Sequence, residues 1–518
     1  MDIFFKYRPV FSAFMRKALK PPRLESHFAS WLRRDKKAGK ATTTGKQLFS
    51  WVLLTLGVAM VLAAFVGVPA GLLAILFAAT GWWVWQNPRE AVLFFIVLAP
   101  ILPMLKFTQA GGAITLLKDV IILTLFIRLV AWPLVTKTLA YRYNPLVSPL
   151  IALGTWVILG MLRADNVLLG VLRARDIILY VLLYLAVVQL PLTRSYIRSI
   201  MRWAGASLAV VLMLGVYQWF GAGDSAVLRF DPERLIWIPR ISSVFAHPSV
   251  FGEYLLAAVA WLTAGWLVIK RQQIRIAFFI ASIGLLPFIF LTYSRGVWIG
   301  YVATMATIAV AYVFSRSGRD FKRIFSGATM RSLGIGLLII AATSYMFTPV
   351  GTFIRSSLDP TYASNAERLE FAARLIAPLS TTDALIGVGL GDVTAQNFRS
   401  VSVTTAAIAA GDARDVQLAK NATLVDSQHL KTFVELGFFG LLIYAWVYTQ
   451  AVKASWQAAL QDKVPIKILG LTTLGFIASF IIQGFFIDTW DIFPTNAIFW
   501  ILAGLTIASQ TKMVHDQL

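Results

Sequence analysis

Residues 426–442, DSQHLKTFVELGFFGLL, mark the point where a long polar segment ends and an apolar helix begins. The polar segment, residues 349–428, is too rich in polar side chains to lie in hydrocarbon. Apolar runs of about 20 residues, each long enough to cross a bilayer core of roughly 30 Å, recur on both sides of it. We therefore predict an all-α polytopic integral membrane protein with about 12–14 transmembrane helices. One large outer loop is expected to contain interfacial helices.

The composition supports this class. Of the 518 residues, 58% are hydrophobic and 14% are charged, and the mean hydropathy is +0.72. A net charge of +22 would indicate a nucleic-acid partner for a soluble chain. In a membrane protein, Lys and Arg accumulate in cytoplasmic segments, so the positive charge indicates which segments face the cytoplasm. The chain contains no cysteine, which excludes disulfides and thiol chemistry.

The predicted spans divide the chain into five parts. A basic N-terminal tail at residues 1–48 and a short tail at 511–518 are expected on the cytoplasmic side. Between them lie a membrane helix bundle at 49–348, the large outer loop at 349–428 and C-terminal membrane helices at 429–510. Both termini are therefore predicted to be cytoplasmic.

Arginine is concentrated in the segments predicted to lie outside. These segments are 163–176, 221–247, the turn at Ser294–Arg295, and 349–428. Segment 163–176 is expected to lie along the outer interface, followed by a membrane span at 177–192. Positive charge is normally scarce outside, whereas the arginine fork suits bidentate phosphate recognition. The predicted outer arginines include Arg163, Arg173, Arg175, Arg229, Arg234, Arg240, Arg295, Arg368 and Arg374. We interpret some of them as a site for an anionic group and the others as partners of nearby carboxylates.

His429 is the leading candidate for a general base. It opens an apolar helix directly after Asp426, Ser427 and Gln428, any of which can cap that helix. The positive end of the helix dipole disfavours an imidazolium ion, so we expect a neutral ring, the form that a base needs. The alternative interpretation is an interfacial histidine that only caps the helix.

Charged residues also lie close to predicted hydrocarbon. Arg295, in LTYSRGVWIG, sits between two apolar runs, where a charge is costly and indicates function. Arg240 and His247 precede the span that contains Glu253. Lys118 and Asp119, adjacent within one span, are expected to point to different faces.

Metal and nucleotide chemistry find little support in the sequence. The glycine-rich stretch GVGLGD at 387–392 follows no strand of a nucleotide-binding fold, so it indicates a tight turn or a close backbone approach to a ligand. No Asp-x-Asp motif or zinc-ligand spacing occurs, and Asp488 and Asp491 are too few for a metal site.

The order and sidedness of these motifs resemble the O-antigen ligase and polymerase superfamily over roughly residues 90–510. The resemblance rests on HPSVFGEYL after Arg240, on TYSRGVWIG around Arg295, and on IGVGLGDV within the loop. It also rests on His429 followed by Glu435, Gly437 and Gly440.

The resemblance implies an enzyme that moves a glycan from undecaprenyl diphosphate to an acceptor hydroxyl at the periplasmic face of the bacterial inner membrane. Its partners would be the undecaprenyl-diphosphate-linked glycan, an acceptor glycan or glycolipid, and membrane lipids. No nucleic acid, metal or cofactor is implied. Both ligase and polymerase activity remain open.

The resemblance also assigns roles to residues. His429 would be the base, and Arg240 and Arg295 would bind the diphosphate. Secondary candidates are Arg368, Arg374, Glu253 and His247. The alternative function is a polytopic transporter of a small anion or a polysaccharide precursor, although paired halves with broken helices are not evident in the sequence.

Overall fold

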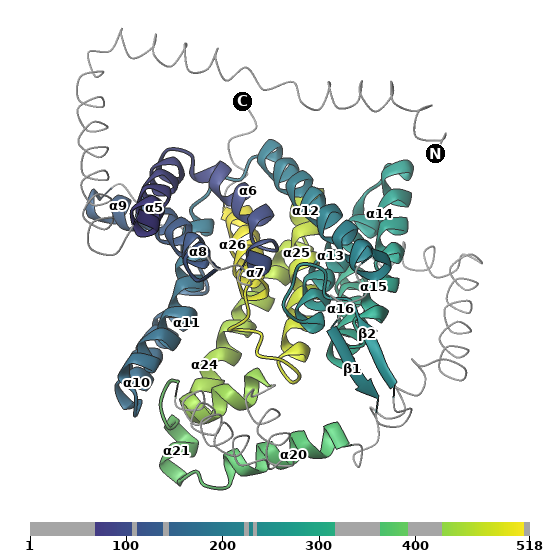
Figure 1. Cartoon of the computed structure of the whole chain (residues 1–518). Helices are drawn as coiled ribbons and strands as arrows, with labels where there is room; N and C mark the ends of the chain where they lie inside the picture. The colour runs from purple at the N-terminus through teal and green to yellow at the C-terminus, as the bar shows by residue number, and fades with distance from the viewer. Residues whose placement is uncertain are drawn as a thin grey trace. The chain divides into compact units, whose positions relative to one another are not determined.

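A computed structural model describes residues 68–105, 111–137, 144–221, 227–231, 236–315, 363–391 and 427–511. The chain divides into two compact units, Met1–Ala79 and Thr80–Leu518, and the second holds every residue of the site described below. Figure 1 labels the elements. They are α5 (Val68–Gln86), α6 (Pro88–Leu98), α7 (Leu102–Leu105), α8 (Gly111–Phe126), the π-helix η1 (Ile127–Ala131), α9 (Trp132–Val135), α10 (Val147–Arg163), α11 (Val167–Val188), α12 (Arg194–Gly221), β1 (Val227–Asp231), β2 (Ile236–Arg240), α13 (Pro248–Val268), α14 (Gln272–Gly284), α15 (Leu286–Leu291), α16 (Arg295–Phe314), α20 (Ala363–Ile376), α21 (Thr381–Ile386), α24 (Gln428–Ala459), α25 (Val464–Gln483) and α26 (Thr495–Thr511).

The described residues contain six helical segments that are long and apolar enough to cross a membrane. They are Arg194–Gly221, Pro248–Val268, Gln272–Leu291, Arg295–Phe314, Gln428–Ala459 and Val464–Gln483. The prediction of an all-α polytopic membrane protein is therefore confirmed. Residues 49–67 and 316–348 of the predicted membrane bundle lie outside the described residues, so the total of about 12–14 helices stays a prediction.

One short hairpin interrupts the helices. Strands β1 and β2 pair antiparallel, with Val227 opposite Arg240 and Asp231 opposite Ile236 (Figure 1). Apolar β-branched and aromatic residues in both strands favour this pairing. The hairpin lies in the segment predicted to be outside, and it ends at Arg240.

The predicted division between an interfacial segment at 163–176 and a span at 177–192 is wrong. Helix α11 runs without a break from Val167 to Val188, and the Asn166 side chain caps it by accepting from the Leu169 amide at 3.2 Å. The charges that suggested a boundary are instead satisfied within the protein, because Arg173 and Arg175 pair with carboxylates of other elements.

Helix α25 is central to the bundle, where it packs against α13, α16, α24 and α26. Glycines permit this packing: a Cβ on Gly475 would lie 2.7 Å from Ile308 Cδ1, and one on Gly470 would lie 2.4 Å from the backbone nitrogen of Ala459. The hydroxyl of Thr304 donates to the Gly475 carbonyl at 3.1 Å. Close backbone approach with side-chain hydrogen bonds is typical of helix packing in membranes.

Several helix ends meet at one end of the bundle. Hydroxyls of Ser249 and Ser294, at the starts of α13 and α16, are 3.0 Å apart. The backbone amide of Gln428, at the start of α24, donates to the carbonyl of Ile487 at 3.2 Å. Ile487 lies four residues after the end of α25. Helix α21 also packs against α24 (Figure 1). We call this region, formed by the first turns of α13, α16 and α24 and the last turn of α25, the loop end.

Candidate functional site

His429 sits in the turn that ends α25. Ser427 caps α24 by accepting from the Leu430 amide at 3.4 Å, and its hydroxyl donates to the Gly484 carbonyl at 3.2 Å. The Nε2 atom of His429 lies 2.9 Å from the Ile481 carbonyl, and the ring packs on Phe485 with centroids 4.4 Å apart. A carbonyl only accepts, so Nε2 carries the proton in this contact. In a neutral ring, Nδ1 is then the basic nitrogen.

Arg240 and Arg295 come from two neighbouring connections. Arg240 is buried at the end of β2, and its Nε donates to the Thr292 carbonyl at 2.7 Å. Arg295 begins α16, three residues after Thr292. His247 is exposed and caps α13, where its Nδ1 accepts from the Ser249 amide at 3.2 Å. The N-termini of α13 and α16 and the guanidinium group of Arg240 therefore lie in one region, with Arg295 in the first turn of α16, and this arrangement favours an anion.

The end of α25 is close both to this region and to His429. A Cβ on Gly296, next to Arg295, would lie 2.5 Å from Gln483 Oε1. A Cβ on Gly484, the residue directly after α25, would lie 2.7 Å from His429 Nε2. The three principal predicted residues therefore lie at the same end of the bundle, although they span almost two hundred positions of sequence. Their chemical roles remain predictions.

The secondary candidates are less closely grouped. Glu253 is fully buried one turn into α13, beside Thr495 of α26. Arg374 is largely exposed on α20 and pairs with Glu370 four residues before it. Arg368 belongs to α20, but its side chain lies outside the described residues.

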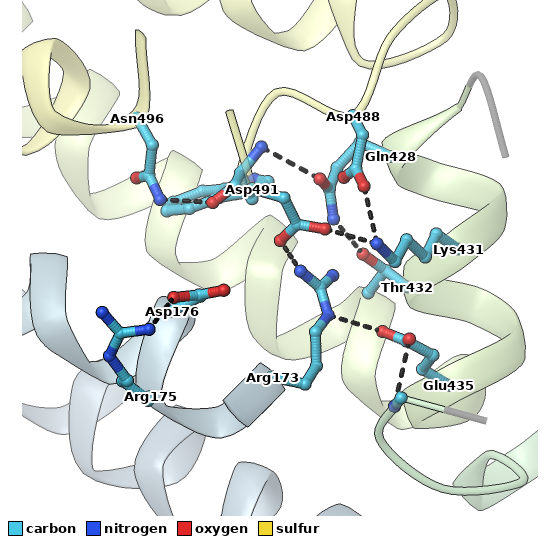
Figure 2. Close-up of polar contacts among 12 residues, drawn as sticks. Arg173, Arg175, Asp176, Gln428, Lys431, Thr432, Glu435, Asp488, Asp491 and Asn496 are labelled. Atoms are coloured by element: carbon cyan, nitrogen blue, oxygen red, sulfur yellow. Dashed lines mark hydrogen bonds and ion pairs between the residues drawn. The ribbon is translucent and has the colours of Figure 1, made fainter. Parts of the chain in front are cut away.

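An ion-pair network, drawn in Figure 2, was not predicted as a site, and one of its members, Lys431, lies two positions after His429 on α24. The Nε atom of Arg173 donates to Glu435 Oε2 at 3.0 Å, and its Nη1 contacts Asp491. Lys431 Nζ donates to Asp488 at 2.7 Å and to Asp491 at 2.5 Å. We call these five residues the Arg173–Glu435 network. Two features of the sequence could have indicated this network: Lys431 and Glu435 are spaced to share one helix face, and Arg173 lies within an apolar helix. Neither feature shows that Arg173 pairs with Glu435, because the two residues are 262 positions apart.

The glycine-rich stretch 387–391 docks on a break in α24. Gly437 has φ 71°, so the helix is interrupted there and carbonyls before it lose their usual partners. The amides of Val388 and Gly389 donate to the carbonyls of Val434 at 2.9 Å and Glu435 at 3.3 Å. The Trp156 indole donates to the Leu436 carbonyl at 2.8 Å. The sequence predicted that GVGLGD forms a tight turn or brings the backbone close to a ligand. The structure shows a turn whose backbone lies close to the backbone of α24.

We expect Gly387→Ala to destabilise the protein by at least about 2 kcal/mol. Gly387 has φ 84°, and a Cβ there would lie 2.2 Å from the Glu435 carbonyl oxygen. Such backbone conformations cost about 1–3 kcal/mol for residues with a side chain, before any clash is counted. Thermal unfolding in detergent measures the effect. Gly154→Ala on α10 is the matched control, since no atom lies within 4 Å of its added Cβ and alanine suits a helix better. Equal melting temperatures for both variants would contradict the docking described here.

Lys118 and Asp119 form another buried ion pair. Lys118 Nζ lies 2.6 Å from Asp119 Oδ1, so these neighbours do not point to different faces as predicted. Asp119 also pairs with Arg175 of α11. Both residues are buried, and the pairing is favourable because an unpaired charge is costly in an apolar environment.

Metal-binding residues do not cluster in the part of the chain that the structure describes. No group of three or more His, Cys, Asp or Glu side chains there could hold a metal ion. Asp488 and Asp491 are each paired with Lys431 instead. Metal-independent chemistry remains a prediction.

Fold and site together define a polytopic α-helical membrane protein with a polar, arginine-containing site at one end of its helix bundle. Residues 276–445 match the family model described as O-antigen ligase. The predicted resemblance to the O-antigen ligase/polymerase superfamily is therefore confirmed over about a third of the chain. The match includes Arg295 and His429 and begins after Arg240. No curated protein matches the chain.

This family indicates a glycosyltransferase-type enzyme of surface-polysaccharide assembly. Its substrates are of the lipid-linked glycan and acceptor type, and together with the six apolar helices it indicates a multi-pass inner-membrane protein.

Proposed function

We propose that the protein moves a glycan from undecaprenyl diphosphate to an acceptor hydroxyl at the periplasmic face, as an O-antigen ligase or polymerase. The observation that carries the proposal is that His429 and the residue next to Arg295, both within the family match, each lie against the end of α25. This arrangement suits a reaction that needs a base and an anion site close to the membrane.

In the proposed reaction, the acceptor oxygen attacks the anomeric carbon of the lipid-linked sugar. His429 takes the hydroxyl proton on Nδ1, because Nε2 already donates to the Ile481 carbonyl. The bond from the anomeric carbon to the diphosphate oxygen breaks, and undecaprenyl diphosphate leaves with the electron pair. Arg240 and Arg295, with the N-termini of α13 and α16, stabilise the negative charge that gathers on the leaving group.

An apolar cavity supports a lipid-linked substrate. It has a volume of about 170 Å³ and lies among α6, α12, α13, α25 and α26. Its lining includes Ile200, Leu208, Ala258, Leu469 and Ile501. Such a surface favours hydrocarbon over a hydrated sugar, so we propose that part of the polyprenyl tail occupies it.

Deletion of the gene is expected to leave lipid-linked glycan in the membrane, because the transfer step is lost. Extraction and mass spectrometry of the surface glycans would measure this, with the wild-type gene supplied in trans as the control. Single repeat units on undecaprenyl diphosphate would identify a polymerase, and intact polymer on the same carrier would identify a ligase. A deletion strain with wild-type glycans and no lipid-linked intermediate would contradict the proposal.

A further inference from the structure

His429 lies in a short helical segment that a break separates from the rest of α24, so the rest of the helix does not fix the direction of this segment. The break at Gly437 separates Gln428–Leu436 from the membrane-spanning part of α24. A helix of nine residues does not fix its own direction in a protein, because isolated short helices are marginal. Contacts made by the first two turns must therefore hold His429 in place.

Those contacts lie on one face. Gln428, Lys431 and Glu435 are spaced at i, i+3 and i+7, which places them together toward α11 and the turn at 488–491 (Figure 2). Gln428 Oε1 accepts from the Trp490 amide at 2.9 Å, while Lys431 bonds both aspartates of the turn. His429, one position later than Gln428, faces α25 instead.

Glu435 is the most deeply buried residue of the network. Glu435 is 1% exposed and Arg173 is 8% exposed, so the ion pair between them is shielded from water. One carboxylate oxygen accepts from Arg173, and the other accepts from the Gly391 amide at 3.2 Å. A buried charge that loses its partner is strongly unfavourable, so the geometry of this pair is tightly specified.

The network also carries a slight excess of negative charge. Three carboxylates, of Glu435, Asp488 and Asp491, share the two cations of Arg173 and Lys431. Each cation therefore has to be held in place by specific contacts, and a change at Glu435 or Arg173 weakens the buried bond that joins the first turns of α24 to α11. Movement of that segment moves His429.

We propose that Arg173 and Glu435 are positioning residues that hold His429 in the last turn of α25. They act through the helix segment and do not touch substrate. The catalytic consequence rests on the proposed function, in which His429 is the base, whereas the positional consequence does not.

The positional consequence is tested by chemical modification of His429. In Glu435→Gln, and independently in Arg173→Lys, we expect diethyl pyrocarbonate to modify His429 at least about threefold faster, because the segment opens more often. His247, which is exposed, serves as the internal reference in the same digest, read by mass spectrometry. Unchanged modification of His429 in both folded variants would overturn the proposal.

The catalytic consequence is tested with the same variants in purified full-length protein. The donor is the lipid-linked glycan extracted from a deletion strain, and the readout is release of undecaprenyl diphosphate. We expect kcat to fall by about 10–100-fold while KM for the donor changes little, because a displacement near 1 Å can cost about a hundredfold. A rise in KM without loss of kcat would contradict positioning of the base.

Tyr184→Phe is the matched control for a buried polar change on α11. It removes the hydrogen bond from the Tyr184 hydroxyl to Asn144. We expect a lower melting temperature with unchanged His429 modification and unchanged kcat. If this variant also exposed His429, the effect of Glu435→Gln would be general loosening, and the proposal would be wrong.

The two proposals fail in different ways. Faster His429 modification in Glu435→Gln together with an active His429→Ala would support the positioning but reject His429 as the base. Unchanged modification with an inactive His429→Ala would reject the positioning and keep the base.

Discussion

His429→Ala is expected to lower glycan transfer by about 10²–10⁴-fold, the range that a positioned general base contributes. The substitution removes Nδ1, the nitrogen left free to accept a proton when Nε2 donates to the Ile481 carbonyl. The fold should survive, since the cap of Ser427 and the bonds of Gln428 and Lys431 are retained. Transfer is measured as release of undecaprenyl diphosphate, or in cells as displayed polysaccharide.

His515→Ala, in the predicted cytoplasmic tail, is the matched control and should have wild-type activity. Membrane expression of both variants must be equal by immunoblot. Wild-type polysaccharide display by His429→Ala at normal expression would reject His429 as the base. Retained His429→Asn activity would also reject it, because an amide can hydrogen-bond but cannot take the proton.

Arg295→Lys is expected to lower transfer by about a hundredfold, although the charge is kept. Lysine offers a single point charge where arginine offers a planar fork that matches two phosphate oxygens. Loss of one such contact to a developing negative charge costs about 10²–10³ in kcat. Steady-state kinetics with the lipid-linked donor measures the change.

Arg271→Lys, at an exposed position between α13 and α14, is the control and should match wild type. Arg240→Lys should also be poor, but it loses the bond to the Thr292 carbonyl, so a fall in melting temperature will accompany it. Full activity in Arg295→Lys would count against a guanidinium clamp on the diphosphate.

The sequence by itself determined the class of the fold and the three principal site candidates. Apolar runs near 20 residues define membrane helices because each must satisfy its backbone internally in hydrocarbon. Arg295 could be singled out because a charge between two apolar runs is costly. His429 could be placed at a helix start because capping is local, and Ser427 does cap that helix.

Local patterns misled wherever a charge had a distant partner. The arginines of α11 suggested a boundary at residue 176, yet the helix continues to Val188 because Arg173 meets Glu435 and Arg175 meets Asp119. Hydropathy windows record the cost of a buried charge but cannot record its neutralisation by another element. The hairpin that ends at Arg240 was missed for a related reason, since short strands are set by pairing more than by propensity.

Only the tertiary structure decided how His429 is held. Gly437 breaks α24, the glycine-rich turn binds the released carbonyls, and Arg173 fixes Glu435 across 262 positions of sequence. None of these contacts can be predicted from a periodic pattern in the sequence. Each contact joins two elements that are far apart in the chain and that only packing brings together. The residues of the site were therefore readable in the chain, while their orientation comes from a buried network that exists only when the helices are assembled.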